Sequence, residues 1–148
     1  MSPDIRLVRA GDEGLLDAIA PEVFDRPINP ATLKRFLGEP NHYLFVAIEA
    51  ETIVGFISAV LYEHPDKPAS ELWINELAVA PSHQRHGIGA ALLDALLAHA
   101  RTLGCSEAWV LSDKNNAKAK RLYASRTNQP PIEVQMFTFL LADPASGD

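Results

Sequence analysis

Residues 84–89 combine residue types and spacing that predict phosphate chemistry. The segment reads Gln84-Arg85-His86-Gly87-Ile88-Gly89, a basic loop in which two glycines open an apolar stretch. Free N–H groups at a helix start, and the positive end of the helix dipole, bind phosphate. Glycine also lets a phosphate approach the backbone without hindrance from a Cβ atom. The segment therefore predicts a site for the diphosphate of a nucleotide-like ligand, with a purely structural turn as the alternative.

Two other phosphate-binding motifs fit this segment less well. The dinucleotide fingerprint places G-x-G-x-x-G directly after a strand, with an acidic residue roughly 20 positions further on. Here Leu92 occupies the third glycine position, and residues 81–86 separate the glycines from the preceding strand, although Asp113 stands where a ribose-binding acid is expected. A Walker loop is excluded because no glycine is followed by Lys and then Ser or Thr.

The hydrophobic pattern predicts which elements position this loop. We expect six strands, at residues 5–9, 43–48, 53–61, 72–79, 109–111 and 134–141. We expect four helices, at residues 13–24 (interrupted at Pro21), 31–37, 87–103 and 116–124. The strand–helix–strand unit over 72–112 is expected to be parallel and right-handed. We therefore predict one α/β domain over residues 1–148, with a mixed sheet, helices on both faces and a loose tail at 141–148.

Composition narrows the functional classes. The chain has 148 residues, of which 47% are hydrophobic, and a formal net charge of −6. An acidic chain disfavours nucleic acid as the main partner and fits a cationic substrate. One cysteine, Cys105, and five scattered histidines predict neither an internal disulfide nor a metal site. Short apolar runs and a charged N-terminal segment predict no membrane span and no signal peptide, so we expect a cytoplasmic protein.

Two motifs together resemble those of the GNAT superfamily of N-acetyltransferases. Residues 84–89 match its acetyl-CoA loop, Q/R-x-x-G-x-G/A, and residues 77–81, Leu-Ala-Val-Ala-Pro, look like the splayed strand before it. Residues 116–123, from Asn116 to Tyr123, match its N-x-x-A-x-x-L-Y motif. The resemblance covers roughly residues 5–141. It departs after Tyr123, where Thr127 and Asn128 replace the expected glycine and aromatic residue.

The resemblance implies a mixed, mostly antiparallel sheet whose fourth and fifth strands are parallel and splay apart. It also implies direct acetyl transfer from acetyl-CoA to an amine. In this chain Glu76 would be the general base, through a water molecule, and Tyr123 the general acid. The acetyl-CoA site would comprise Leu77, Ala78, Val79, Gln84, Arg85, His86, Gly87, Ile88, Gly89 and Asn116.

Three features of the sequence are most similar to those of type I aminoglycoside 3-N-acetyltransferases. They are residues 23–25, Val-Phe-Asp, the acid within residues 74–79, and Glu133 before the last expected strand. The implied substrate-binding residues are Asp25, Glu76 and Glu133. Strand periodicity places Glu76 on the face of Ile74 and Ala78. The resemblance also implies a possible homodimer.

Several functional readings remain open. The leading one is an N-acetyltransferase for a small cationic amine such as an aminoglycoside. The others are acetylation of a protein N-terminus or lysine, a non-catalytic acetyl-CoA-binding module, and a Rossmann-type oxidoreductase that would bind NAD. A nucleophilic role for Cys105 is disfavoured, because no basic neighbour in the sequence would lower the pKa of its thiol.

Overall fold

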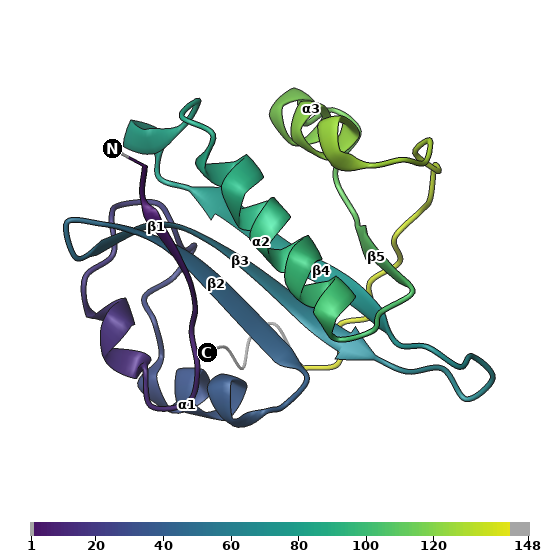
Figure 1. The fold of residues 1–148 in the computed structure, drawn as a ribbon, viewed down its shortest axis with the longest axis horizontal. Coiled ribbons are helices and arrows are strands. Elements are labelled where there is room, and N and C mark those ends of the chain that lie inside the picture. The colour runs from purple at the N-terminus through teal and green to yellow at the C-terminus, as the bar shows by residue number, and fades with distance from the viewer. Residues whose placement is uncertain (1, 143–148) are drawn as a thin grey trace. The chain divides into compact units, whose positions relative to one another are not determined.

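The computed structural model describes residues 2–142, which divide into two compact units. The first unit, up to Asp113, holds a sheet in the order β1-β2-β3-β4-β5 (Figure 1). Its strands are β1 (Asp4–Leu7), β2 (His42–Glu49), β3 (Thr52–Tyr62), β4 (Glu71–Val79) and β5 (Glu107–Val110). Its helices are η1 (Glu13–Asp17), α1 (Pro30–Gly38), η2 (Pro81–His83) and α2 (Ile88–Thr102). The second unit, from Lys114 onward, holds α3 (Ala117–Arg126).

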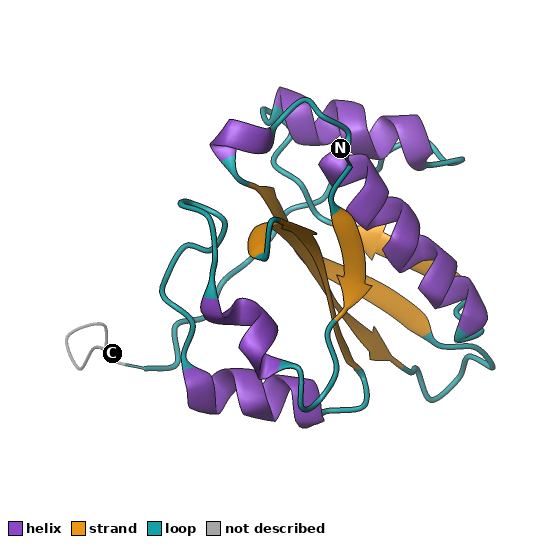
Figure 2. Cartoon of the chain, turned by 60° about the vertical axis from the view of Figure 1, so that its left-hand side comes forward, coloured by secondary structure: helices purple, strands orange, loops and turns teal. Residues whose placement is uncertain are grey.

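The predicted α/β class and mixed sheet are confirmed. Neighbouring strands from β1 to β4 pair antiparallel, whereas β4 and β5 pair parallel across the α2 crossover. Helix α2 covers one face of the sheet, and η1 and α1 cover the other (Figures 1 and 2). A single domain over residues 1–148 stays a prediction, and most of the predicted tail lies outside the described residues.

Local signals place α1 and α2 as predicted. Asn29 caps α1, because its Oδ1 accepts a hydrogen bond from the Thr32 N–H at 3.0 Å, and Pro30 occupies the first helical position. Helix α2 has an apolar face that comprises the buried residues Ile88, Leu92, Leu93, Leu96 and Ala100. This face packs the helix against the sheet and thereby fixes the position of its N-terminus.

The helix predicted at residues 13–24 is wrong beyond Asp17. Only η1 forms, and the chain then turns, with Glu22 at a positive φ of 67°. Pro21 has no N–H for a helical hydrogen bond. The backbone instead bonds to the start of β3: Ala20 N–H donates to Ile53 O at 2.8 Å, and Ile53 N–H donates to Ala18 O at 2.9 Å. These two bonds bring the following residues 23–26 over the sheet.

The strand predicted at residues 134–141 is also wrong, because the described residues after α3 form no strand. The alternation of side chains is present, but a strand exists only when a second strand accepts and donates its backbone hydrogen bonds. Pro130 and Pro131 supply no N–H at the start of this segment.

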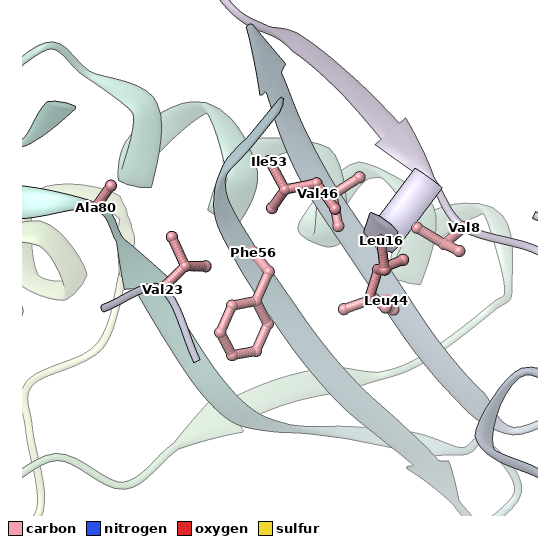
Figure 3. Packing of buried hydrophobic residues seen from close by; sticks show 8 residues of the cluster. All are labelled: Val8, Leu16, Val23, Leu44, Val46, Ile53, Phe56 and Ala80. Carbon is pink, nitrogen blue, oxygen red and sulfur yellow. The ribbon is translucent and has the colours of Figure 1, made fainter. Parts of the chain in front are cut away.

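A cluster of buried apolar side chains fills the face of the sheet opposite to α2. Figure 3 shows eight of its members, namely Val8, Leu16, Val23, Leu44, Val46, Ile53, Phe56 and Ala80. The Phe24 ring extends this cluster by stacking on Phe56, with ring centroids 4.1 Å apart. The cluster therefore holds residues 23–24 against β3, next to the part of β4 that carries Glu76.

Candidate functional site

The loop before α2 has the geometry of an anion cradle. Arg85 and Gly87 both adopt left-handed backbone conformations, with φ values of 68° and 79°. Left-handed residues at alternate positions turn the successive N–H groups toward one side, where these groups form an anion-binding concavity. A Cβ atom on Gly87 would have no neighbour within 4 Å, so the space in front of the loop is open.

The N-terminus of α2 supplies further donors. The first intrahelical bond runs from Ala91 N–H to Gly87 O at 3.0 Å, so the N–H groups of the preceding residues point out of the helix end. Gly87 is the N-cap residue of α2, and no side-chain cap hydrogen bond forms there among the described residues. Arg85 and His86 are exposed beside these donors. The loop therefore offers the donors that a diphosphate would need, and its role in binding stays a prediction.

Two side chains anchor this loop to the sheet. Gln84 Nε2 donates to Val79 O at 3.1 Å, which ties the loop to the end of β4. His83 Nε2 lies 3.0 Å from Glu49 Oε1, and its Nδ1 lies 2.8 Å from Ser82 Oγ. The hydrogen bond with His83 lowers the pKa of the Glu49 carboxyl. Sequence reasoning missed Glu49, because it lies 34 positions from His83.

The edge of β4 that faces β5 is open where thioester binding is expected. The two strands pair only from Glu71 to Ile74 on β4, so among the described residues this edge has no strand partner beyond that point. Ala80 N–H donates to Val54 O on β3 at 2.8 Å. Because successive N–H groups of a strand point to alternate edges, those of Leu77 and Val79 point to the open edge, and that of Ala78 points toward β3.

A β-bulge in β4 corrects the predicted orientation of Glu76. Ile74 pairs with Ala59 and Glu76 with Ser58, so Asn75 is an extra residue without a partner on β3. Residues directly opposite each other in antiparallel strands point to the same side. Glu76 therefore shares a face with Ala78, as predicted, but not with Ile74, whose side chain points toward α2.

Glu76 lines an open pocket on the sheet face opposite to α2. The pocket has a volume of about 280 Å³, and its lining residues are Phe24, Asp25, Arg26 and Glu76. The predicted substrate residues Asp25 and Glu76 thus meet in one cavity. Arg26 was not predicted. The pocket is therefore lined by two acidic residues and one basic residue.

The predicted residues Asn116, Tyr123 and Glu133 belong to the second unit, so their part in this site stays a prediction. Asn116 Oδ1 caps α3 by accepting a hydrogen bond from Ala119 N–H at 3.1 Å. Burial raises the pKa of the half-buried Tyr123 phenol, which therefore stays protonated at neutral pH. Glu133 is exposed.

The departure at Thr127 is compatible with the end of α3. Thr127 has an extended backbone with φ −82°, a conformation that any residue adopts. Its Oγ1 accepts a hydrogen bond from Gln129 N–H at 3.1 Å. The turn therefore does not need the expected glycine.

Other chemistries receive little support from the described residues. Burial raises the pKa of the Cys105 thiol, which keeps it protonated and a poor nucleophile. Residues 2–142 contain no group of three His, Cys, Asp or Glu side chains that could hold a metal ion. Within the same residues, no helix combines the length and apolarity needed to cross a membrane.

Comparison with known proteins gives this geometry a family context. The model of the acetyltransferase (GNAT) family matches residues 14–127. The chain is 27% identical over 111 residues to an N-acetyltransferase of Mycobacterium tuberculosis strain H37Rv, covering 72% of this chain and 68% of that protein.

Two solved structures share the fold at similar length. The aminoglycoside acetyltransferase HMB0005, from an uncultured soil metagenomic sample, has a TM-score of 0.83 and 26% identity, covering 96% of this chain and all of that one. The aminoglycoside acetyltransferase meta-AAC0020, from a similar sample and in complex with trehalose, has a TM-score of 0.79 and 25% identity. The match covers 94% of this chain and 96% of meta-AAC0020.

Proposed function

Because the chain belongs to the acetyltransferase (GNAT) family, we propose that it transfers the acetyl group of acetyl-CoA to a primary amine of a small polycationic substrate, with an aminoglycoside as the first candidate. The observation that carries this proposal is the pocket in which Asp25 and Glu76 meet. It lies where β4 turns toward the phosphate-binding loop, so an amine held there is close to the open strand edge.

Enzymes of this family use acetyl-CoA, and the residues of the first unit fit that co-substrate. The loop over residues 84–89 would hold the diphosphate through backbone N–H groups and Arg85. The N–H groups of Leu77 and Val79 would bind pantetheine and the thioester oxygen. A donor aimed at this oxygen stabilises the negative charge that develops on it during amine attack. Asn116 would contact the CoA arm with the part of its amide that does not cap α3.

The reaction requires proton transfers at three points. Glu76 would accept the first proton of the substrate ammonium through a water molecule, which leaves a neutral amine to attack the thioester carbon. The carbon–sulfur bond then breaks, and Tyr123 would donate a proton to the CoA thiolate. The nitrogen, which carries a positive charge after the attack, would lose its second proton to water, and Tyr123 would regain a proton from water. The raised pKa of Tyr123 keeps the phenol protonated but makes it a weaker acid, so its proton transfer to the thiolate would depend on close positioning. Much of the rate would come from positioning of the two substrates.

The aminoglycoside proposal has two supports. Two carboxylates in one pocket suit a substrate that carries several ammonium groups, and HMB0005, an aminoglycoside acetyltransferase, is similar over its whole length. Acetylation at the 3-amino position, with Glu133 as a further substrate contact, follows from the sequence resemblance to type I enzymes. A role in antibiotic resistance is a further proposal that depends on this activity.

A direct test is the release of CoA in a thiol-trapping assay. Purified protein with acetyl-CoA would be offered sisomicin, spermidine and short peptides in parallel. We expect turnover with sisomicin, and we expect Tyr123→Phe to lower kcat about 100-fold or more if the phenol supplies the proton. Turnover on peptides alone would favour the protein acetyltransferase. Tight binding of acetyl-CoA without turnover on any amine would favour the non-catalytic module.

We also propose a homodimer in the cytoplasm. In the segment after α3, seven large apolar residues each expose between 63% and 96% of their surface: Ile132, Val134, Met136, Phe137, Phe139, Leu140 and Leu141. A second copy could cover this apolar segment and supply the strand partner that its alternating pattern requires. Sedimentation analysis would test this. Phe137→Ser should shift a dimer toward monomer, and a wild-type monomer at all concentrations would contradict the proposal.

A further inference from the structure

The chain has two tryptophans, and they form one stack on the sheet. Trp73 on β4 and Trp109 on β5 are register partners, and their rings lie 5.4 Å apart at an interplanar angle of 14°. Trp73 nevertheless exposes 40% of its surface. Tryptophan is enriched at interfaces, because its ring offers a large apolar face beside a polar N–H group.

The stack rests on a connected set of hydrogen bonds. Trp109 Nε1 donates to Tyr62 Oη at 2.6 Å, and Tyr62 Oη donates to Glu71 Oε1 at 3.0 Å. Lys67 Nζ donates to Glu71 Oε2 at 2.9 Å, so the charge of the buried Glu71 is already matched. Because this network and the stack hold the Trp73 ring, little side-chain entropy remains to be lost when a ligand binds to it.

Trp73 lies on the same sheet face as the pocket. On β4, Trp73 pairs with Val60 and Glu76 pairs with Ser58. Val60 and Ser58 are two positions apart on β3, so both pairs point to one side of the sheet, opposite to α2. Three positions of β4 separate Trp73 from Glu76, a span of roughly 7–10 Å. An acceptor of two linked amino-sugar rings could bridge a span of this size.

We propose that the exposed part of Trp73 is a second acceptor subsite, which binds a further cationic amino-sugar ring while the pocket at Glu76 holds the amine to be acetylated. The inference rests on the proposed function, because it takes Glu76 to mark the acceptor site. A ring that carries ammonium groups would lie over the indole through cation–π attraction and apolar contact. The subsite would select acceptors with two cationic rings over compact monoamines.

Tryptophan fluorescence tests the subsite without requiring acetyl transfer. In Trp109→Phe, Trp73 is the chain's sole tryptophan, so its emission can be excited selectively over tyrosine. We expect a saturable change in emission with sisomicin, a weaker change with spermidine, and none with glucosamine at the same concentrations. Trp109→Phe keeps an aromatic ring in the stack but loses the Nε1 donor, so its midpoint should lie at or somewhat above that of wild-type protein titrated in parallel.

Steady-state kinetics supply the second readout. Trp73→Leu keeps apolar bulk but removes the aromatic face, and we expect it to raise the KM for sisomicin about five- to tenfold while kcat changes less than about twofold. Trp73→Phe should lie between wild type and Trp73→Leu, and the KM for glucosamine should not move. Leu103→Ala, which truncates a side chain of similar exposure (37%) at the end of α2, is the matched control.

The outcomes separate this inference from the proposed function. Sisomicin turnover with an unchanged KM in Trp73→Leu and silent emission would overturn the subsite and leave the acetyltransferase intact. A saturable emission change without turnover on any aminoglycoside would overturn the proposed substrate and, with it, the assignment of Trp73 to an acceptor subsite. Silence in both assays would overturn both proposals.

Discussion

The two ends of β4 each carry a glutamate on the same face of the sheet, yet their surroundings are opposite. Glu71 is 5% exposed, and its carboxylate is held by Lys67 and Tyr62. The bond from Lys67 is the main cause of its lowered pKa, and the bond from Tyr62 contributes as well. Glu76 is exposed and lines an open pocket. One strand therefore provides a carboxylate that stabilises the fold and another that is available to a ligand.

The pairing of the strands explains this difference. From Glu71 to Ile74, β4 lies between two partners, and its side chains meet neighbours from β3 and β5. At Asn75 the bulge interrupts the register, and the pairing with β5 has ended. Beyond this point one strand edge and one face are open. The short fifth strand, Glu107–Val110, is therefore what leaves this edge of β4 without a strand partner beyond Ile74.

We call the part of β4 from Asn75 onward the open end. The largest effect should come from removing the Glu76 carboxylate there. We expect Glu76→Gln to lower kcat about 100-fold or more, because the amine then lacks a base, while the melting temperature changes little. Steady-state CoA release and thermal denaturation would measure both quantities. Glu63→Gln, on the exposed loop after β3, is the control and should leave both unchanged. An active Glu76→Gln variant would show that the two ends of β4 do not differ in function.

The second prediction concerns the position of the open end. A Cβ atom on Gly55 would lie 3.0 Å from Ala78 O, 3.3 Å from Leu92 Cδ1 and 3.4 Å from Ile88 Cγ2. Gly55→Ala should therefore push β4 and α2 apart, at a cost of about 1–3 kcal/mol in the free energy of unfolding. Because the N–H groups of Leu77 and Val79 move with Ala78, the KM for acetyl-CoA should rise as well.

Gly38→Ala is the matched control for this change. Its Cβ atom would have no neighbour within 4 Å at the end of α1, so we expect no loss of stability and no change in KM. Urea denaturation of both variants gives the comparison. Equal stabilities of the two would mean that the contact between Gly55 and Ala78 does not position β4.

Much of this architecture could be predicted from the sequence, because it depends on local signals. The apolar face of α2, the cap at Asn29 and the glycine at the start of α2 are each encoded within a few residues. The two motifs at residues 84–89 and 116–123 identified the family. These features need no knowledge of which strands are neighbours.

The features that were missed depend on pairing between distant residues. The extra residue at Asn75 is visible only once β4 is aligned with β3, so the face of Ile74 relative to Glu76 was predicted wrongly. Arg26 enters the pocket because Ala18 and Ala20 bond to Ile53, which no local pattern indicates. The segment 134–141 has the alternation of a strand, but pattern alone does not provide a partner.

A third prediction concerns the closed end of β4, which is the part from Glu71 to Ile74 that pairs with both neighbouring strands. It tests how the stability that Glu71 provides depends on pH. Glu71→Gln should lower the melting temperature near neutral pH by about 5 °C, because Lys67 loses its carboxylate partner. A lowered pKa in the folded state means that the Glu71 contribution is fully present above the ordinary glutamate pKa and is lost as pH falls through the folded value. Lys67, whose pKa is raised by the same bond, loses its contribution only as pH rises through its folded value.

The difference in stability between wild type and Glu71→Gln should therefore be constant at mid-range pH and shrink toward acid. Denaturation curves at several pH values would measure it, with Glu76→Gln as the comparison. We expect Glu76→Gln to follow the wild-type curve. A difference that stays constant into strong acid would show that the Glu71 carboxylate does not stabilise the closed end.

The smallest effect should come from the bond between the loop and the open end. In Gln84→Ala the Nε2 donor to Val79 O is lost, so the end of β4 and the phosphate loop move more independently. We expect the KM for acetyl-CoA to rise about threefold to tenfold, the size of one net hydrogen bond, with the KM for the amine unchanged. Gln84→Glu keeps the length of the side chain without the donor and should behave like Gln84→Ala. If Gln84→Glu instead raised the KM for acetyl-CoA far more, its negative charge would be acting on the bound diphosphate. Gln84 would then lie against the ligand, and its main role would be contact rather than anchoring.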